Sequence, residues 1–76
     1  MSYAIYGESD TYVFLVTSPT PEQAIEEFIT DVKDVGVKLS HVYNIFAVNG
    51  RTEDKNLEDK LEAIVAQAAD SEKEVE

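Results

Sequence analysis

Two short apolar runs lie close together near the start of the chain, at residues 3–6 and 11–17. Both are rich in β-branched and aromatic residues, which favour strands, and residues 7–10 between them are turn formers. The pattern predicts a β-hairpin. In the second run the side chains at odd and even positions alike are mostly apolar, so we expect that strand to lie in the centre of the sheet.

A helical period follows at residues 21–35. Thr20 is a suitable N-cap, Pro21 suits the first helical position, and Gln23 completes a capping box. Gly36 supplies a left-handed stop at the far end. The apolar side chains recur at helical spacing: Ala24, Ile25, Phe28, Ile29, Val32 and Val35. We expect one amphipathic helix over this range.

A third apolar stretch covers residues 37–48 and ends at an Asn-Gly turn dipeptide. Its alternation is broken by Val42, which follows Lys38 and Ser40 on the same face. We therefore expect a bulge or a late strand start just before Val42, near the Ser-His pair, and a continuous strand over residues 41–48.

A second helix is predicted after this strand. Either Thr52 or Asn56 can cap it, and Glu53 and Asp54 suit the positive end of its dipole. Residues 70–76 contain a single apolar side chain, so we expect them to form an acidic disordered tail. The apolar stripe of the helix consists of Leu57, Leu61, Ile64, Val65 and Ala68.

The elements follow the order β-β-α-β-α, which predicts a single α+β domain over residues 1–69. We expect a three-stranded, largely antiparallel sheet with two helices on one face. The other face would expose aromatic and aliphatic side chains. Such a patch on a small domain often marks a self-association or partner surface, so the sequence allows a homodimer.

The composition is that of a chain that folds. Of its 76 residues 43% are apolar, and four Tyr and three Phe can supply one core. The absence of cysteine excludes disulfides and a cysteine zinc site, and favours a cytoplasmic setting. We see neither a signal peptide nor an apolar run approaching the roughly 20 residues that span a bilayer.

Charge is the unusual quantity, because sixteen Asp and Glu against six Lys and Arg give a formal net charge of -10. The charge is -2 over residues 1–19, -4 over 20–35, +2 over 36–51 and -6 over 52–76, so it belongs to the helices and the tail. This field repels nucleic acids and anionic membranes and attracts basic proteins. We expect a basic protein as the partner, with no direct nucleic acid and no membrane.

The candidate binding residues are acids on the exteriors of the two predicted helices. Several stand four residues apart, a like-charge spacing that costs about 0.2 to 0.5 kcal/mol per pair in an isolated helix. Four residues rise roughly 6 Å, which is comparable to the spacing of successive phosphates along a nucleic-acid strand. The set is Glu22, Glu26, Glu27, Asp31, Asp34, Glu53, Asp54, Glu58, Asp59 and Glu62.

In its size, its charge and these acidic helices the chain resembles the small DNA-mimic inhibitors that bacteriophages direct against host DNA-binding proteins, such as histone-like nucleoid proteins. The resemblance covers most of the chain and includes no sequence motif. It implies a competitive inhibitor that acts in host takeover, in the host cytoplasm if a phage encodes it. Affinity would fall as salt rises.

Two other interpretations stay open. Acids on helix exteriors commonly serve solubility alone. The chain could instead be a protein-protein interaction or dimerisation module that uses the apolar sheet face, with Tyr3, Tyr6, Tyr12 and Tyr43 as candidate anchors, since aromatic residues are enriched in binding hot spots.

Catalysis has little support in the sequence. His41 is the one histidine, and no serine or cysteine nucleophile accompanies it in a recognisable setting. Residues 53–59 lack the ligand order and the glycine of a calcium loop, and the three glycines form no phosphate-binding loop. We expect no enzymatic activity, no metal and no cofactor.

Overall fold

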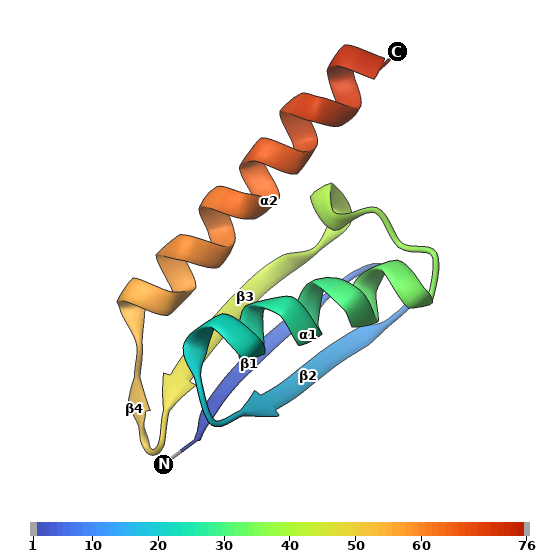
Figure 1. Cartoon of the computed structure of the whole chain (residues 1–76). Helices are drawn as coiled ribbons and strands as arrows, with labels where there is room; N and C mark the ends of the chain where they lie inside the picture. The colour runs from blue at the N-terminus through green and yellow to red at the C-terminus, as the bar shows by residue number, and fades with distance from the viewer. Residues whose placement is uncertain (1, 76) are drawn as a thin grey trace.

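The computed structural model describes the backbone of residues 2–75 and the side chains of residues 2–70. The chain is of the α+β class. Two helices cover one face of a single antiparallel sheet and leave the other face uncovered (Figure 1). Its elements are β1 (Tyr3–Glu8), β2 (Val13–Ser18), α1 (Pro21–Asp34), the short 3-10 helix η1 (Leu39–His41), β3 (Tyr43–Asn49), β4 (Thr52–Glu53) and α2 (Lys55–Val75).

The sheet has four strands rather than the predicted three, in the order β2-β1-β3-β4, and every neighbouring pair is antiparallel. The additional strand is β4, in which Glu53 lies opposite Val48 and Thr52 opposite Asn49. Gly50 has a φ of 65°, a left-handed conformation that allows this tight reversal. The residues expected to start the second helix therefore extend the sheet instead.

β2 is an edge strand, and the prediction that it lies in the centre is wrong. The inner strands are β1 and β3, and Tyr6 of β1 lies between Leu15 of β2 and Phe46 of β3. After α1 the chain returns on the far side of β1, which leaves β2 without a second neighbour. The side chains of β2 that point away from the helices are exposed, at 65% for Val13 and 66% for Leu15, because no second layer of the described chain covers that face of the sheet.

The hydrophobic core lies between the inner face of the sheet and the two helices. Phe28 of α1 and Leu61 of α2 are both fully buried there, so each helix contributes to one shared core. In the described part of the chain the buried apolar residues of this core are Ile5, Phe14, Val16, Ala24, Phe28, Val32, Leu39, Val42, Ala47, Leu57 and Leu61.

The hairpin between β1 and β2 is confirmed, but its turn begins later than the predicted residues 7–10. Gly7 is part of β1, where it lies under the ring of Phe28; a Cβ at this position would be 2.6 Å from Cζ. The chain reverses between Ser9 and Tyr12, where the Ser9 N–H donates to the Tyr12 carbonyl at 2.8 Å. Close packing of the helix on the strand thus explains the glycine.

Helix α1 confirms the predicted boundaries to within one residue. The Thr20 hydroxyl accepts a hydrogen bond from the Gln23 N–H at 3.2 Å, which caps the first turn. At the other end Gly36 adopts a φ of 80°, and the Val37 N–H donates to the Val32 carbonyl at 3.2 Å. This is the glycine-terminated helix end that the sequence predicts.

β3 starts late, as predicted, and it also contains a β-bulge, which was predicted to lie just before the strand. The chain forms η1 first, and β3 begins only at Tyr43. Tyr6 of β1 lies opposite Phe46, and Glu8 lies opposite Tyr43. Between these two pairs β3 therefore has one residue more than β1, which is a β-bulge. Asn44, inside this bulge, has a φ of 53°. The bulge lies slightly later in the chain than the sequence indicates.

Helix α2 is capped by Asp54 and by neither of the two predicted residues. The Asp54 carboxylate accepts a hydrogen bond from the Leu57 N–H at 3.1 Å, and its carbonyl accepts one from the Glu58 N–H at 3.0 Å. The helix runs along β3 and past η1, and its C-terminal part extends beyond the sheet (Figure 1).

The backbone of α2 is helical as far as Val75, through most of the segment predicted to be a tail. The side chains of residues 71–76 lie outside the described part of the chain, and the disordered tail stays a prediction. Within residues 2–75, no helix combines the length and the apolar content required to cross a membrane.

Candidate interaction surfaces

The solvent side of α1 carries four exposed carboxylates, since Ala24, Phe28 and Val32 turn the opposite side of the helix toward the sheet. Within the described part of the chain, no hydrogen bond or ion pair joins these four to another side chain. We call them the α1 acidic face: Glu22, Glu26, Asp31 and Asp34.

Glu27 lies beside this face but has a structural partner. The buried Ser18 hydroxyl at the end of β2 donates a hydrogen bond to the Glu27 carboxylate. The bond joins the flank of α1 to the edge strand. Glu27 therefore helps to fix the helix over the sheet, and it remains partly accessible at the surface.

Two of the predicted contact residues are structural. Asp54 is half-buried and caps α2 through the Leu57 N–H. Glu58 is only 6% exposed, and its carboxylate lies 3.3 Å from the Lys55 ammonium. The hydrogen bond and the negative charge of Glu58, followed by the charge of Glu53, raise the pKa of Lys55. Glu58 is thus unavailable as a surface contact, contrary to the prediction.

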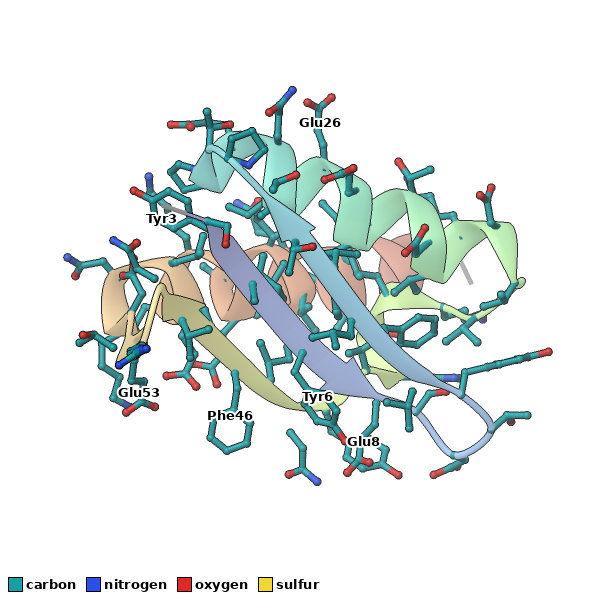
Figure 2. The ribbon with its side chains drawn as sticks, turned by 90° about the horizontal axis from the view of Figure 1, so that it is seen from below. Tyr3, Tyr6, Glu8, Glu26, Phe46 and Glu53 are labelled. Carbon is teal, nitrogen blue, oxygen red and sulfur yellow. The ribbon has the colours of Figure 1, made fainter. Side chains whose placement is uncertain are left out.

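The remaining predicted acids, Glu53, Asp59 and Glu62, are exposed but lie elsewhere. β4 forms the opposite edge of the sheet from β2. Figure 2 accordingly shows Glu26 on the outer side of α1 and Glu53 far from it, beside β4. The ten predicted residues therefore do not form one continuous surface, and the α1 acidic face comprises those that are exposed along one helix without a side-chain partner among the described residues.

A groove of about 440 Å³ runs between the flank of α1 and the edge strand β2. Its helix side presents carboxylates and its strand side presents the end of β2. Sequence reasoning missed the strand side, because it placed β2 inside the sheet. The lining residues are Val16, Thr17, Gln23, Glu26, Glu27, Thr30 and Asp31.

The outer face of the sheet, which no helix covers, is largely apolar. Val13, Leu15 and Phe46 are 65%, 66% and 53% exposed. The Tyr6 ring lies between the strands that carry them and is 6.4 Å from the Phe46 ring, measured between centroids. In Figure 2 Tyr6 and Phe46 project from the side of the sheet opposite α1 and Glu26. We call this surface the outer sheet face.

Polar groups border the outer sheet face near the hairpin turn. The Tyr6 hydroxyl donates to the Glu8 carboxylate at 3.2 Å, and the Tyr43 hydroxyl donates to Asp10 at 3.3 Å. The Asn44 amide also donates to Glu8. Desolvation is the largest cause that raises the pKa of each tyrosine, and the neighbouring carboxylates raise it further.

The described residues offer little for catalysis or metal binding. His41 is exposed at the end of η1. No group of three or more His, Asp or Glu side chains in the described part of the chain is arranged to hold a metal ion.

Comparison of the chain with models of known protein families, with curated proteins and with solved structures finds no match.

Proposed function

We propose that the chain is a non-enzymatic acidic binding protein of the DNA-mimic type. It occupies the nucleic-acid-binding surface of a basic DNA-binding protein, such as a histone-like nucleoid protein, and thereby inhibits it. The observation that carries this proposal is the α1 acidic face, in which four exposed carboxylates follow one 14-residue helix without a described cationic partner. The activity belongs in the cytoplasm, in that of the host if a phage encodes the chain.

The arrangement suits a cationic partner for a physical reason. Like charges in succession along a helix repel one another, which costs about 0.2 to 0.5 kcal/mol for each i, i+4 pair. A basic surface that covers them removes this repulsion and releases counterions from both surfaces. Glu22 and Glu26, and likewise Glu27 and Asp31, stand four residues apart along α1, a rise of roughly 6 Å that is near the spacing of phosphates in a strand.

The proposed footprint is narrower than the sequence indicates. It centres on the α1 acidic face and Glu27, which are exposed, whereas Asp54 is half-buried at the start of α2 and Glu58 is buried beside Lys55. Glu53, Asp59 and Glu62 belong to a separate surface and would add to affinity only for a partner that reaches around α2.

A competition experiment tests the proposal. The chain is titrated into a preformed complex of a purified histone-like nucleoid protein and a fluorescent DNA duplex, and the anisotropy of the duplex is followed. We expect the chain to release the duplex at low salt. Its direct binding to the nucleoid protein, measured without DNA, should weaken as salt rises and be lost at about 1 M, where the screening length is only about 3 Å. If unlabelled DNA releases the duplex at low salt and the chain does not, the proposal is wrong.

The outer sheet face supports a second candidate function, a protein-protein interaction or dimerisation module. The exposure of Val13, Leu15 and Phe46 favours it, because contiguous apolar surface of this kind is uncommon on monomeric proteins. Association through this face would resist salt. Sedimentation equilibrium at high salt would show an oligomer of the natural chain that a Phe46→Ser substitution dissociates; a monomer at every concentration would contradict it.

A further inference from the structure

β2 has an unpaired edge whose backbone direction the structure defines. The Ser9 N–H donates to the Tyr12 carbonyl across the hairpin turn, so these two residues form a hydrogen-bonded pair. Hydrogen-bonded and non-hydrogen-bonded pairs alternate along an antiparallel ladder. In the observed register the hydrogen-bonded residues of β2 are therefore Phe14, Val16 and Ser18. The N–H and C=O groups of the intervening residues of β2 therefore point away from β1, toward solvent.

The edge of β2 lacks the features that usually protect an edge strand. Its six residues contain no charged side chain and no proline, and it carries no bulge against β1. Natural sheets commonly place lysine, proline or a bulge at such an edge to prevent pairing with another chain. An extended segment can therefore add to β2 through backbone hydrogen bonds.

The groove beside this edge determines which segment fits. A strand added to β2 would lie about 4.8 Å from it, directly beneath the flank of α1. Every second side chain of that strand would enter the groove, where Glu26, Glu27 and Asp31 present carboxylates. The alternate side chains would lie next to Leu15 and extend the outer sheet face.

We propose that an extended basic segment of the partner protein adds to β2 as a fifth strand of the sheet. In this segment lysine or arginine alternates with apolar residues, so that the cations enter the carboxylate-lined groove and the apolar side chains continue the outer sheet face. The inference rests on the proposed function and deepens it, because it states which part of a basic partner is bound and how.

A second copy of the chain is a poor occupant of the same edge. Two β2 strands paired about a two-fold axis would place both α1 helices on one side of the joined sheet. The carboxylates of both grooves would then face one another, and like charges brought together in this way oppose association. Charge complementarity therefore favours a cationic segment.

The direct test is amide hydrogen exchange by NMR with a peptide probe. The probe has about seven residues, a common strand length, with capped ends and lysine or arginine alternating with valine. At saturation we expect exchange at the outward amides of Val13, Leu15 and Thr17 to slow by about tenfold or more, the range that one added backbone hydrogen bond supplies. Binding that leaves these three amides unprotected overturns the inference.

Two probes of identical charge provide the matched control. One carries backbone N-methyl groups on its odd residues and the other on its even residues, so that only one of them loses the donors that face β2. We expect the affinities of the two peptides to differ by about tenfold or more. Equal affinities overturn strand addition, because a purely electrostatic contact does not distinguish the two.

A substitution in the chain tests the same edge. Leu15→Pro removes an outward N–H without removing a β1–β2 hydrogen bond, and proline is tolerated at such edge positions. We expect it to fold and to bind the unmethylated peptide about tenfold more weakly. Undiminished affinity overturns the inference, and if the variant does not fold the methylated peptides decide.

The outcomes separate this inference from the proposed function. If the chain still competes with DNA for the histone-like protein while the β2 amides stay unprotected, strand addition alone is wrong. If it does not compete at all, the proposed function is wrong. Protection of the same amides that rises with protein concentration, without peptide, would identify a second copy as the occupant and overturn the basic segment.

Discussion

Gly7 and Phe28 meet where β1 passes beneath α1. A Cβ on Gly7 would lie 2.6 Å from Phe28 Cζ and 3.0 Å from Val42 Cγ1, and both neighbours belong to the core. Gly7→Ala should therefore lower the free energy of unfolding by about 1 to 3 kcal/mol, the usual cost of overpacking. Urea denaturation measures this change.

Phe28→Leu supplies the control for this prediction. Because the smaller side chain leaves room for the alanine, the double variant should lose less than the sum of the two single losses, with a coupling of about 0.5 kcal/mol or more. A Gly7→Ala change below about 0.5 kcal/mol, typical of surface substitutions, would contradict the close approach.

The tyrosines at the border of the outer sheet face give a prediction about pH. Desolvation raises the pKa of Tyr6 and Tyr43 above the ordinary 10.0, with further contributions from Glu8 for Tyr6 and chiefly Asp10 for Tyr43. Each of these phenols holds its proton more tightly in the folded state than in the unfolded state. The resulting contribution to stability is fully present below the unfolded-state pKa, and it is lost as the pH rises through the folded-state pKa. Urea unfolding should show stability falling above about pH 10.

A variant with both tyrosines changed to phenylalanine identifies the groups responsible. Its free energy of unfolding should fall less over the same alkaline range, and its absorbance near 295 nm should lose the two late-ionising phenols. An equally steep fall in the variant would mean that other groups, such as Lys55, account for the alkaline loss.

The roles of individual acids were the hardest feature to predict from the sequence. Glu58 lies at the border of the apolar stripe, next to Leu57 and three residues before Leu61. Burial at such a border depends on how the helix is rotated against the sheet, which the period of the sequence does not determine. The acids opposite the apolar stripe of α1 were predicted as exposed, and they are exposed.

At the scale of elements, α1 is the best-predicted part of the chain because its signals are local. Thr20, Pro21 and Gly36 define its ends, and its apolar period is unbroken. The place of β2 in the sheet is not local. An apolar strand with two apolar faces is typical of a central position, yet here its second face is exposed. The strand order is decided by β3, which pairs with β1 on the side away from β2. The residues of β2 carry no information about that choice.

The residue that caps α2 also could not be identified from the sequence alone, and the observed cap can be tested by substitution. Thr52, Asp54 and Asn56 are all residue types that cap helices, at two-residue intervals, so the sequence does not distinguish them. The observed cap is Asp54. Asp54→Ala should lower the free energy of unfolding by about 1 kcal/mol, and Asn56→Ala by much less. Thermal or urea unfolding that ranks the two variants in the reverse order would contradict this assignment.

At the scale of the whole molecule, two chemically different surfaces lie on opposite sides of a thin fold. The helices turn carboxylates outward, and the bare side of the sheet exposes apolar side chains (Figure 2). β2 borders both surfaces, since its edge opens into the groove beneath α1 and its outward side chains belong to the outer sheet face. A partner that contacts both would approach from this edge.

The central claim is that the α1 acidic face, rather than net charge, binds the partner. Two variants of equal charge separate these alternatives. In one, Glu22 and Glu26 become Gln and Asp31 and Asp34 become Asn; in the other, the four acids of residues 70–76 are changed in the same way. Removal of four acids brings each from -10 to -6.

The most direct measurement is the affinity of each variant for a histone-like nucleoid protein at low salt, obtained by competition against labelled DNA. We predict that the α1 variant loses roughly tenfold to thirtyfold, at about 0.4 to 0.5 kcal/mol per exposed charge. The tail variant should stay close to the natural chain. Equal weakening of the two variants, or no weakening of the α1 variant, would contradict the account.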